Sequence, residues 1–340
     1  MLFRYRRTAG DDDIVRTMAK TVFAACLMLA VSALGNDGSG EALPAGGIQL
    51  RRETRISMEK ERLRIGMDRV SVEYEFLNTT NEDIATEVLF PLPGANVSFS
   101  PRPLGVSGWH VWVEGKERPY ETETKAVVKG ADQSALLRRF SVDIATFGHF
   151  DTDADGKIKG DMQKLTAAQQ RELTRAGLLD NGFPTWTVFT TYHWRQTFPA
   201  HRILHVKHEY EPSSGLRYFD AAYFQNDNEE LSSSCVNAGL RKSLVAAAPK
   251  NLGFVEGSID TLWVDYILTT ANTWRTPIKD FELVVERPKP EDRRQTLVSF
   301  CWDGTVEDRG NEGVVARVQN FVPSRELRVM FFKLVNQRAL

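Results

Sequence analysis

Residues 69–76 read RVSVEYEF, and this short stretch indicates the fold. Apolar and polar residues alternate along it, so one face collects Val70, Val72, Tyr74 and Phe76. A period of two residues is that of a β-strand, because successive side chains point to opposite sides of a sheet. The stretch therefore predicts a strand with one face in the core and the other towards solvent.

Similar alternation recurs along most of the chain, and turn residues separate one run from the next. Such runs at short spacing favour antiparallel sheets over alternating βαβ units. We expect a mainly β protein with antiparallel β-sandwich architecture, comprising one or two sandwiches with a helical insertion. The later runs are TWTVFTTYHWRQTF (185–198), HRILHVKHEYEP (201–212), LWVDYILTT (262–270), FELVVERP (281–288), TLVSFCW (296–302), VVARVQNF (314–321) and ELRVMFFKL (326–334).

Helical spacing replaces the alternation in the middle of the chain. The segment LTAAQQRELTRAGLL (165–179) begins with a capping-box pattern, Thr166 and Gln169, and Gly177 can end the helix. Residues 131–140 and 234–248 are further helix candidates. The expected organisation is a signal segment 1–35, an N-terminal β-rich part 36–125, a helical insertion with an Asp-rich loop 126–183, and a C-terminal β-rich part 184–340.

The N-terminus has the pattern of a cleavable secretory signal peptide. Arg16 and Lys20 precede the apolar run TVFAACLMLAVSALG, which ends at Gly35. This run is too short for a comfortable membrane span. We expect cleavage after Gly35, a periplasmic or secreted location, and no transmembrane anchor after cleavage. Acidic residues near the start leave Met1 and Met18 both open as the first residue.

Signal cleavage leaves Cys235 and Cys301 as the only thiols. In an oxidising compartment two cysteines are expected to pair, so we predict one disulfide between them. The alternative is two unrelated buried cysteines that act as small apolar residues.

Composition excludes one class of function. The chain has 340 residues, 42% of them hydrophobic, and a formal net charge of -2. It therefore lacks the positive field with which proteins attract DNA or RNA, and we expect no nucleic-acid partner.

The most specific chemical pattern is DTDADGKIKGDM, residues 151–162. An EF-hand-type calcium loop takes carboxylates at positions 1, 3 and 5, a glycine at 6 and a backbone carbonyl at 7. These positions hold Asp151, Asp153, Asp155, Gly156 and Lys157.

Position 12 of this loop departs from the pattern, because Met162 stands where a bidentate Glu is expected. Asp161 or a carboxylate from elsewhere then completes the shell. We expect a weak structural calcium (Ca2+) site, and the alternative is an acidic turn without an ion.

The second constellation lies in YHWRQTFPAHRILHVKHEY, residues 192–210. Alternation along the expected strand places His208 on the face of Val206 and Tyr210, and His205 on the opposite face. We therefore expect His208 to be a hydrogen-bonded core residue. A zinc site formed by His193, His201 and His205 is the alternative.

Other catalytic patterns are weak. The sequence has no nucleophile elbow and no glycine-rich phosphate cradle. Tryptophans could stack on sugars, although aromatic residues in strands usually belong to the core; they are Trp109, Trp112, Trp194, Trp263 and Trp274. A pocket formed by Trp194, His208 and Tyr210 would suit a hydrolase only if it brings His208 together with a carboxylate or a hydroxyl group and opens to solvent.

Several segments together resemble a bacterial secreted family known as domain of unknown function 4424. The matching pieces are Asn36-Asp37, Gly46-Gly47, RISMEKERLRI, VEYEFLNTTNEDIATEVLFPLP, VWVEG, WRQTFP (194–199), His208-x-Tyr210-x-Pro212, YILTTANTW, Pro277-Ile278 and Asp280-Phe281. The resemblance covers nearly the whole mature chain and implies membership without implying an activity, since the family has none assigned.

These observations predict an exported, non-catalytic β-sandwich protein of unknown activity. We expect a binding or structural module that contacts a protein or glycan partner and holds a structural calcium ion. The alternative is an extracytoplasmic hydrolase with its pocket around His208, Tyr210 and Trp194.

Overall fold

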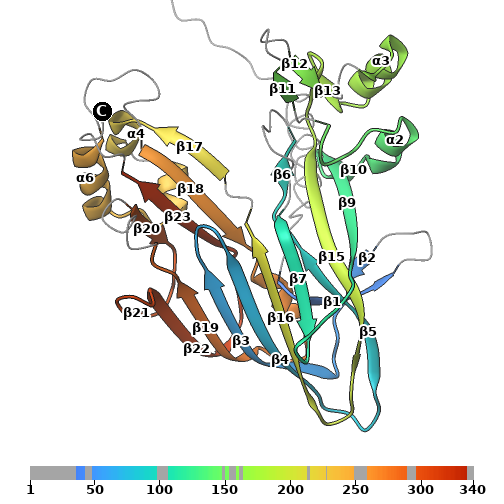
Figure 1. Cartoon of the computed structure of the whole chain (residues 1–340), viewed down its shortest axis with the longest axis vertical. Helices are drawn as coiled ribbons and strands as arrows, with labels where there is room; N and C mark the ends of the chain where they lie inside the picture. The colour runs from blue at the N-terminus through green and yellow to red at the C-terminus, as the bar shows by residue number, and fades with distance from the viewer. Residues whose placement is uncertain are drawn as a thin grey trace, which may run out of the picture. The chain divides into compact units, whose positions relative to one another are not determined.

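The structure is a computed structural model that describes most of the chain after residue 35. The described residues are 36–42, 48–97, 106–147, 150–152, 158–160, 164–212, 215–226, 228–248, 259–288 and 296–334. They form three larger, mainly antiparallel sheets, two small hairpins and a few short helices (Figure 1).

The largest sheet has eight strands in the order β21-β22-β19-β3-β4-β16-β7-β8. Neighbouring strands are antiparallel, except that β19 and β3 run parallel. The strands are β3 (Ile56–Ile65), β4 (Val70–Asn78), β7 (Ser107–Val113), β8 (Lys116–Glu117), β16 (Ile203–Glu211), β19 (Ile278–Val285), β21 (Val306–Asp308) and β22 (Val314–Phe321).

A second sheet has seven strands in the order β10-β9-β15-β5-β1-β2, and β6 also pairs with β15. Its strands are β1 (Gly38–Ala42), β2 (Ile48–Leu50), β5 (Ile84–Pro91), β6 (Ala95–Asn96), β9 (Glu121–Val128), β10 (Ala131–Asp132) and β15 (Thr187–Phe198). The long strand β15 is central because it pairs with both β5 and β9.

The third sheet has the order β17-β18-β23-β20. It consists of β17 (Gly215–Phe219), β18 (Ile259–Tyr266), β20 (Thr296–Phe300) and β23 (Leu327–Lys333). The short helices α4 (Ala221–Gln225), α5 (Glu229–Ser233) and α6 (Ala238–Ala247) precede β18, and the 3-10 helix η2 (Thr269–Thr273) follows it. Residues of these α-helices share an apolar cluster with this sheet.

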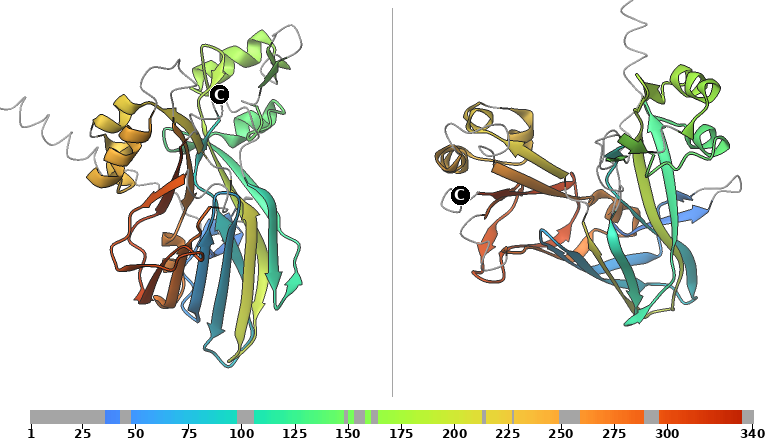
Figure 2. Two further views of the ribbon diagram at one scale, coloured as in Figure 1. Left: turned by 60° about the vertical axis from the view of Figure 1, so that its left-hand side comes forward. Right: turned by 45° about the horizontal axis from the view of Figure 1, so that its top comes forward.

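A smaller apolar cluster around Trp186 joins the second sheet to the inserted helices α2 (Ser134–Arg139) and α3 (Ala167–Arg175). The hairpins here are β11 (Phe150–Thr152) with β12 (Ile158–Gly160), and β13 (Leu179–Asp180) with β14 (Phe183–Pro184). Figure 2 shows α2 and α3 as a group separate from the helices beside β17 and β18.

The main core takes side chains from all three larger sheets. Phe76 on β4 is fully buried, and its ring lies 5.7 Å from that of Phe198 on β15 and 4.8 Å from that of Trp274 after η2. Aromatic contacts of this kind hold the first two sheets together over the buried faces of their strands.

The sequence-based fold class is confirmed: the protein is mainly β and built from antiparallel sheets. Residues 70–76 of RVSVEYEF lie in β4, and the four apolar residues are buried. The capping box of Thr166 and Gln169 opens α3. The predicted division into four parts stays a prediction.

The predicted disulfide is confirmed, since Cys235 and Cys301 are bonded across a sequence separation of 66 residues. It ties the segment between α5 and α6 to the end of β20. Within the part of the chain that the structure describes, no helix is both long and apolar enough to cross a membrane.

Truncating the buried side chain in Phe76→Ala should lower the free energy of unfolding by about 3–5 kcal/mol, because it leaves a cavity among aromatic rings. The control Ile203→Ala removes a side chain that is 46% exposed on the neighbouring β16, and should cost about 0.5 kcal/mol or less. Urea unfolding measures both. Equal losses would contradict the assigned inner face of the sheet.

Candidate functional site

Two features of the fold could carry function: a polar cluster buried in the main core, and an open pocket lined by arginines. The buried cluster forms where β3, β4, β16 and β18 bring polar side chains to the segment Asn36-Asp37. Both of these residues are 0% exposed.

Alternation along the strands explains most of the buried cluster. β16 buries Leu204, Val206, His208 and Tyr210 and exposes His205, as the sequence predicted. On β3 a bulge shifts the register between Met58 and Lys60. This irregularity turns Glu61 rather than Lys60 towards the core, which a regular strand would not do.

His208 is bound to the carboxylate of Asp37. Its Nε2 atom lies 2.9 and 3.0 Å from the two carboxylate oxygens. An ionised carboxylate can only accept, so Nε2–H is the donor. Burial raises the pKa of Asp37, and the charge and hydrogen bond of His208 act in the opposite direction. Trp274 adds a hydrogen bond from its indole nitrogen to the backbone oxygen of Asp37.

Asn36 connects the pair to a second carboxylate. Its side-chain nitrogen lies 3.1 Å from both carboxylate oxygens of Glu61, and its side-chain oxygen accepts from Tyr74. The hydroxyl groups of Tyr74 and Tyr266 are 3.0 Å apart. Burial raises the pKa of Glu61 to about 8, with a smaller contribution from the charge of Asp37, so its neutral form is favoured well above the usual range.

The predicted pocket residues Trp194, His208 and Tyr210 all lie in the core. The Trp194 ring centroid is 5.2 Å from that of His208, and Tyr210 stacks on Trp109, which also stacks on His208. The three predicted residues are 5%, 0% and 4% exposed. His208 thus has the carboxylate partner that a catalytic site requires, and lacks the opening to solvent.

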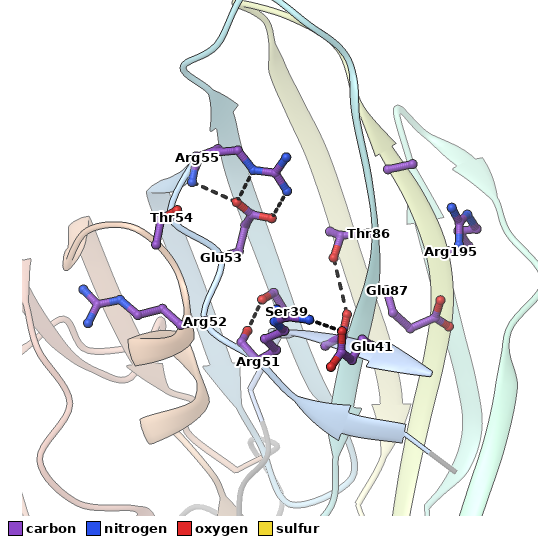
Figure 3. A pocket seen from close by; sticks show the side chains of 12 residues that line it. Ser39, Glu41, Arg51, Arg52, Glu53, Thr54, Arg55, Thr86, Glu87 and Arg195 are labelled. Atoms are coloured by element: carbon purple, nitrogen blue, oxygen red, sulfur yellow. Dashed lines mark hydrogen bonds and ion pairs between the residues drawn. The ribbon is translucent and has the colours of Figure 1, made fainter. Parts of the chain in front are cut away.

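The arginine pocket lies on the second sheet and on the segment that leads from β2 into β3. It has a volume of about 610 Å³ and is open to solvent. Figure 3 shows its side chains. The lining residues are Ser39, Gly40, Glu41, Arg51, Arg52, Glu53, Thr54, Arg55, Ala85, Thr86, Glu87 and Arg195.

Some charges in the arginine pocket are already paired. Arg55 donates from two nitrogens to Glu53, at 2.8 and 2.7 Å, and Arg51 pairs with Glu41. Partial burial would raise the pKa of Glu53, but the hydrogen bonds and charge of Arg55 outweigh it and hold this pKa below its usual value. Glu87 binds His193 at 2.7 Å.

Two guanidinium groups in the arginine pocket differ from the others. Arg52 and Arg195 are exposed and have no ion pair or hydrogen bond to any residue that the structure describes. They lie at opposite sides of the view in Figure 3, and no dashed line reaches either. The pocket therefore presents unpaired positive charge to a ligand.

Sequence reasoning did not predict the arginine pocket. Its residues come from four separate segments that only the folded sheet brings together. The available signal was the run RRETR at residues 51–55, in which three of five residues are arginines, together with Arg195 in the WRQTFP motif.

The predicted metal ligands are not brought together by any described contact. Asp153, Asp155, Lys157 and Asp161 lie outside the described residues, and for Asp151 only the strand is described. His193, His201 and His205 have separate partners, Glu87, Asn81 and Glu114. Among the residues with described placement, no group of three His, Cys, Asp or Glu side chains could hold a metal.

The molecule is a β-sandwich protein with a polar surface site. It has three larger sheets around an aromatic core, one disulfide and an open arginine pocket. The chain belongs to the family described as Domain of unknown function (DUF4424), whose model matches residues 35–330. No curated protein matches it.

Two solved structures share distant likeness with the chain. A candidate nutrient-binding protein from Legionella pneumophila is 14% identical, with a TM-score of 0.39, over 87% of this chain and 73% of that one. Yeast LTA4 hydrolase in complex with bestatin is 9% identical, with a TM-score of 0.29, over 85% of this chain and 31% of the enzyme. Neither likeness is close enough to carry an inference about this protein.

Replacing the buried imidazole in His208→Gln should lower the free energy of unfolding at pH 7 by about 3–5 kcal/mol, because Asp37 then loses its imidazole partner while it stays buried in the core. The matched control is His205→Gln on the exposed face of the same strand, with an expected cost of about 0.5 kcal/mol or less.

Adding Asp37→Asn to His208→Gln should recover part of the loss, since it removes the unpaired carboxylate. The test is chemical unfolding of the wild type, His208→Gln, His205→Gln and the double variant Asp37→Asn/His208→Gln. Similar losses for His208→Gln and His205→Gln would show that the Asp37 contact does not stabilise the fold.

Proposed function

We propose that the protein is an exported, non-catalytic binding module that holds a carboxylate- or phosphate-bearing group of a protein or glycan partner in the arginine pocket. The observation that carries this proposal is the pair Arg52 and Arg195. Both guanidinium groups line the pocket and lack an acidic partner among the described residues.

The chemistry of the arginine pocket fits an anion. A guanidinium group offers a planar fork of donors that matches a carboxylate or a phosphate. Glu41 and Glu53 are paired with Arg51 and Arg55, and Glu87 is hydrogen-bonded to His193. The lining as a whole holds four arginines and three glutamates, so it keeps an excess of positive charge. Ser39 and Thr86 add polar groups to the wall.

The buried pair of Asp37 and His208 favours binding over hydrolysis. A general base must lie within hydrogen-bond reach of the proton that it removes from a substrate. Both residues are 0% exposed, whereas the arginine pocket is open. A hydrolase centred on His208 would require the core to open first.

Export is supported by the disulfide of Cys235 and Cys301, because such bonds persist in oxidising compartments such as the periplasm. The signal pattern before residue 36 supports it independently. We infer a periplasmic or secreted location.

The calcium site belongs to the same proposal. Its support is the residue pattern of 151–162, together with the antiparallel pairing of β11 and β12, which bracket residues 153–157. Extracellular modules bind calcium weakly where the ion is abundant, which suits a structural role.

Millimolar citrate or inorganic phosphate should raise the thermal midpoint of the wild type, since a ligand that binds only the folded state stabilises it. Arg52→Gln and Arg195→Gln should each weaken the anion affinity by about 10-fold or more, because each removes a charge-assisted hydrogen bond. Titration calorimetry measures the affinity.

The matched control for both variants is Arg171→Gln, an exposed arginine on α3 outside the pocket, which should leave the affinity unchanged. If Arg171→Gln weakened anion binding as much as Arg195→Gln does, the binding would be explained by general surface charge rather than by the pocket. Absence of any stabilisation by either anion would refute the proposed ligand class.

Calcium at 10 times its dissociation constant should add about 1.4 kcal/mol to stability, and a chelator should remove this gain. Asp153→Ala should abolish the response, whereas Asp180→Ala, at an exposed position of β13, should retain it. Thermal unfolding with millimolar calcium or chelator measures both. An identical calcium response in Asp153→Ala and the wild type would leave the loop as an acidic turn.

A further inference from the structure

The backbone nitrogen of Asn36 lies inside the core. Asn36 and Asp37 are 0% exposed, and the nitrogen donates to the hydroxyl oxygen of Thr270 on η2 at 2.6 Å. The same hydroxyl donates to the backbone oxygen of Asn36 at 2.6 Å. This residue is held on both sides of its backbone by one buried side chain.

The same nitrogen is the atom that signal cleavage would change. Hydrolysis of the Gly35–Asn36 peptide bond by a signal peptidase adds one water, leaves a carboxylate on Gly35 and leaves an ammonium group on Asn36. The buried polar cluster would then gain one positive charge at the position of a backbone N–H group.

The acidic groups near the Asn36 nitrogen include one, Glu61, that has no positively charged partner. Glu61 accepts from the Asn36 side chain, a neutral group, while Asp37 already has His208. The buried polar residues that the structure describes include no lysine and no arginine. His208 is therefore the partner of Asp37 alone, and Glu61 has no cationic partner that would stabilise its ionised form in the core.

We propose that Asn36 is the mature N-terminus and that its α-ammonium group is held in the buried polar cluster, where Thr270 contacts the nitrogen and Glu61 binds the side chain of the same residue. Removal of the signal peptide should then stabilise the folded protein, because cleavage creates the positive charge that Glu61 lacks as a partner. This inference rests on the export part of the proposed function and is independent of the arginine pocket.

The pH dependence of stability distinguishes the two forms of the chain. In the chain that is still extended before Asn36, burial favours neutral Glu61, whose pKa is raised from 4.5 to about 8. The unfolded chain ionises at the lower value, so stability should fall as pH rises through this window.

A free ammonium group should remove that slope, because it favours ionised Glu61 in the folded state. Stability should then fall only at higher pH, where the ammonium group loses its proton. The other titratable groups that face the cluster are present in both forms, so the two forms differ only in the added charge and its effect on these groups; they are Asp37, Tyr74, His208, Tyr210 and Tyr266.

The test compares the same protein with three beginnings: a free Asn36, an N-acetylated Asn36, and a Gly-Ser extension. A removable fusion partner whose protease leaves Asn36 first gives the free form. We expect its thermal midpoint at pH 7 to exceed that of the other two by at least about 4 °C, given the usual response of domains of this size. Acetylation is the stricter comparison because it adds the fewest atoms.

Glu61→Gln should remove the advantage of the free form. Glu59→Gln, on the same strand and paired with Lys279 at the surface, should keep it. Equal midpoints and equal pH profiles for the free and acetylated wild types would overturn the proposal, and this result needs no variant to fold.

Mass spectrometry of the protein exported from a bacterial host should find a terminal peptide that begins Asn36-Asp37. Exported protein that begins at another residue would refute the proposed terminus while leaving export intact. Unprocessed protein retained in the cytoplasm would refute both export and this inference. Anion binding by the arginine pocket is tested separately and would not be affected by that result.

Discussion

The contact of His208 with Asp37 is the constraint on which the rest of the main core depends. A buried polar pair is tolerated when its groups are hydrogen-bonded. The groups around Asp37 largely meet this demand, although the Nδ1 atom of His208 has no hydrogen-bond partner among the described residues. Trp274 donates to the backbone of Asp37, and Asn36 connects it to Glu61 and Tyr74. The segment before β1 is thereby fixed against strands of two sheets, and the aromatic rings around His208 exclude solvent.

The same core explains why function is expected at the surface. The carboxylates of Asp37 and Glu61 are hydrogen-bonded inside this core and are 0% exposed, so they cannot reach an outside molecule. The arginine pocket shows the opposite balance, with three paired glutamates and two arginines that lack a partner among the described residues. Groups that are mutually satisfied stabilise a fold, whereas unpaired charges in an open pocket are available to a ligand.

Local patterns predicted local structure well. Alternation located β4 and β16 and the inward side of His208, and the capping box located the start of α3. Strand order, the parallel pairing of β19 with β3 and the bulge before Lys60 were not predictable, because each depends on contacts between distant segments. The arginine pocket was missed for the same reason. The calcium loop stays a prediction, since residues 153–157 and 161–163 lie outside the described part of the chain.

The parallel pairing of β3 with β19 has a consequence for the order of folding. It joins residues 60–65 to residues 280–285, so one side of β3 has no partner until most of the polypeptide has left the ribosome. Sheets that depend on such distant pairings form slowly, because the entropy of closing the intervening loop opposes the first contact. A nascent chain therefore carries an open hydrogen-bonding edge for a long interval, and chaperones that shield such edges should determine its yield.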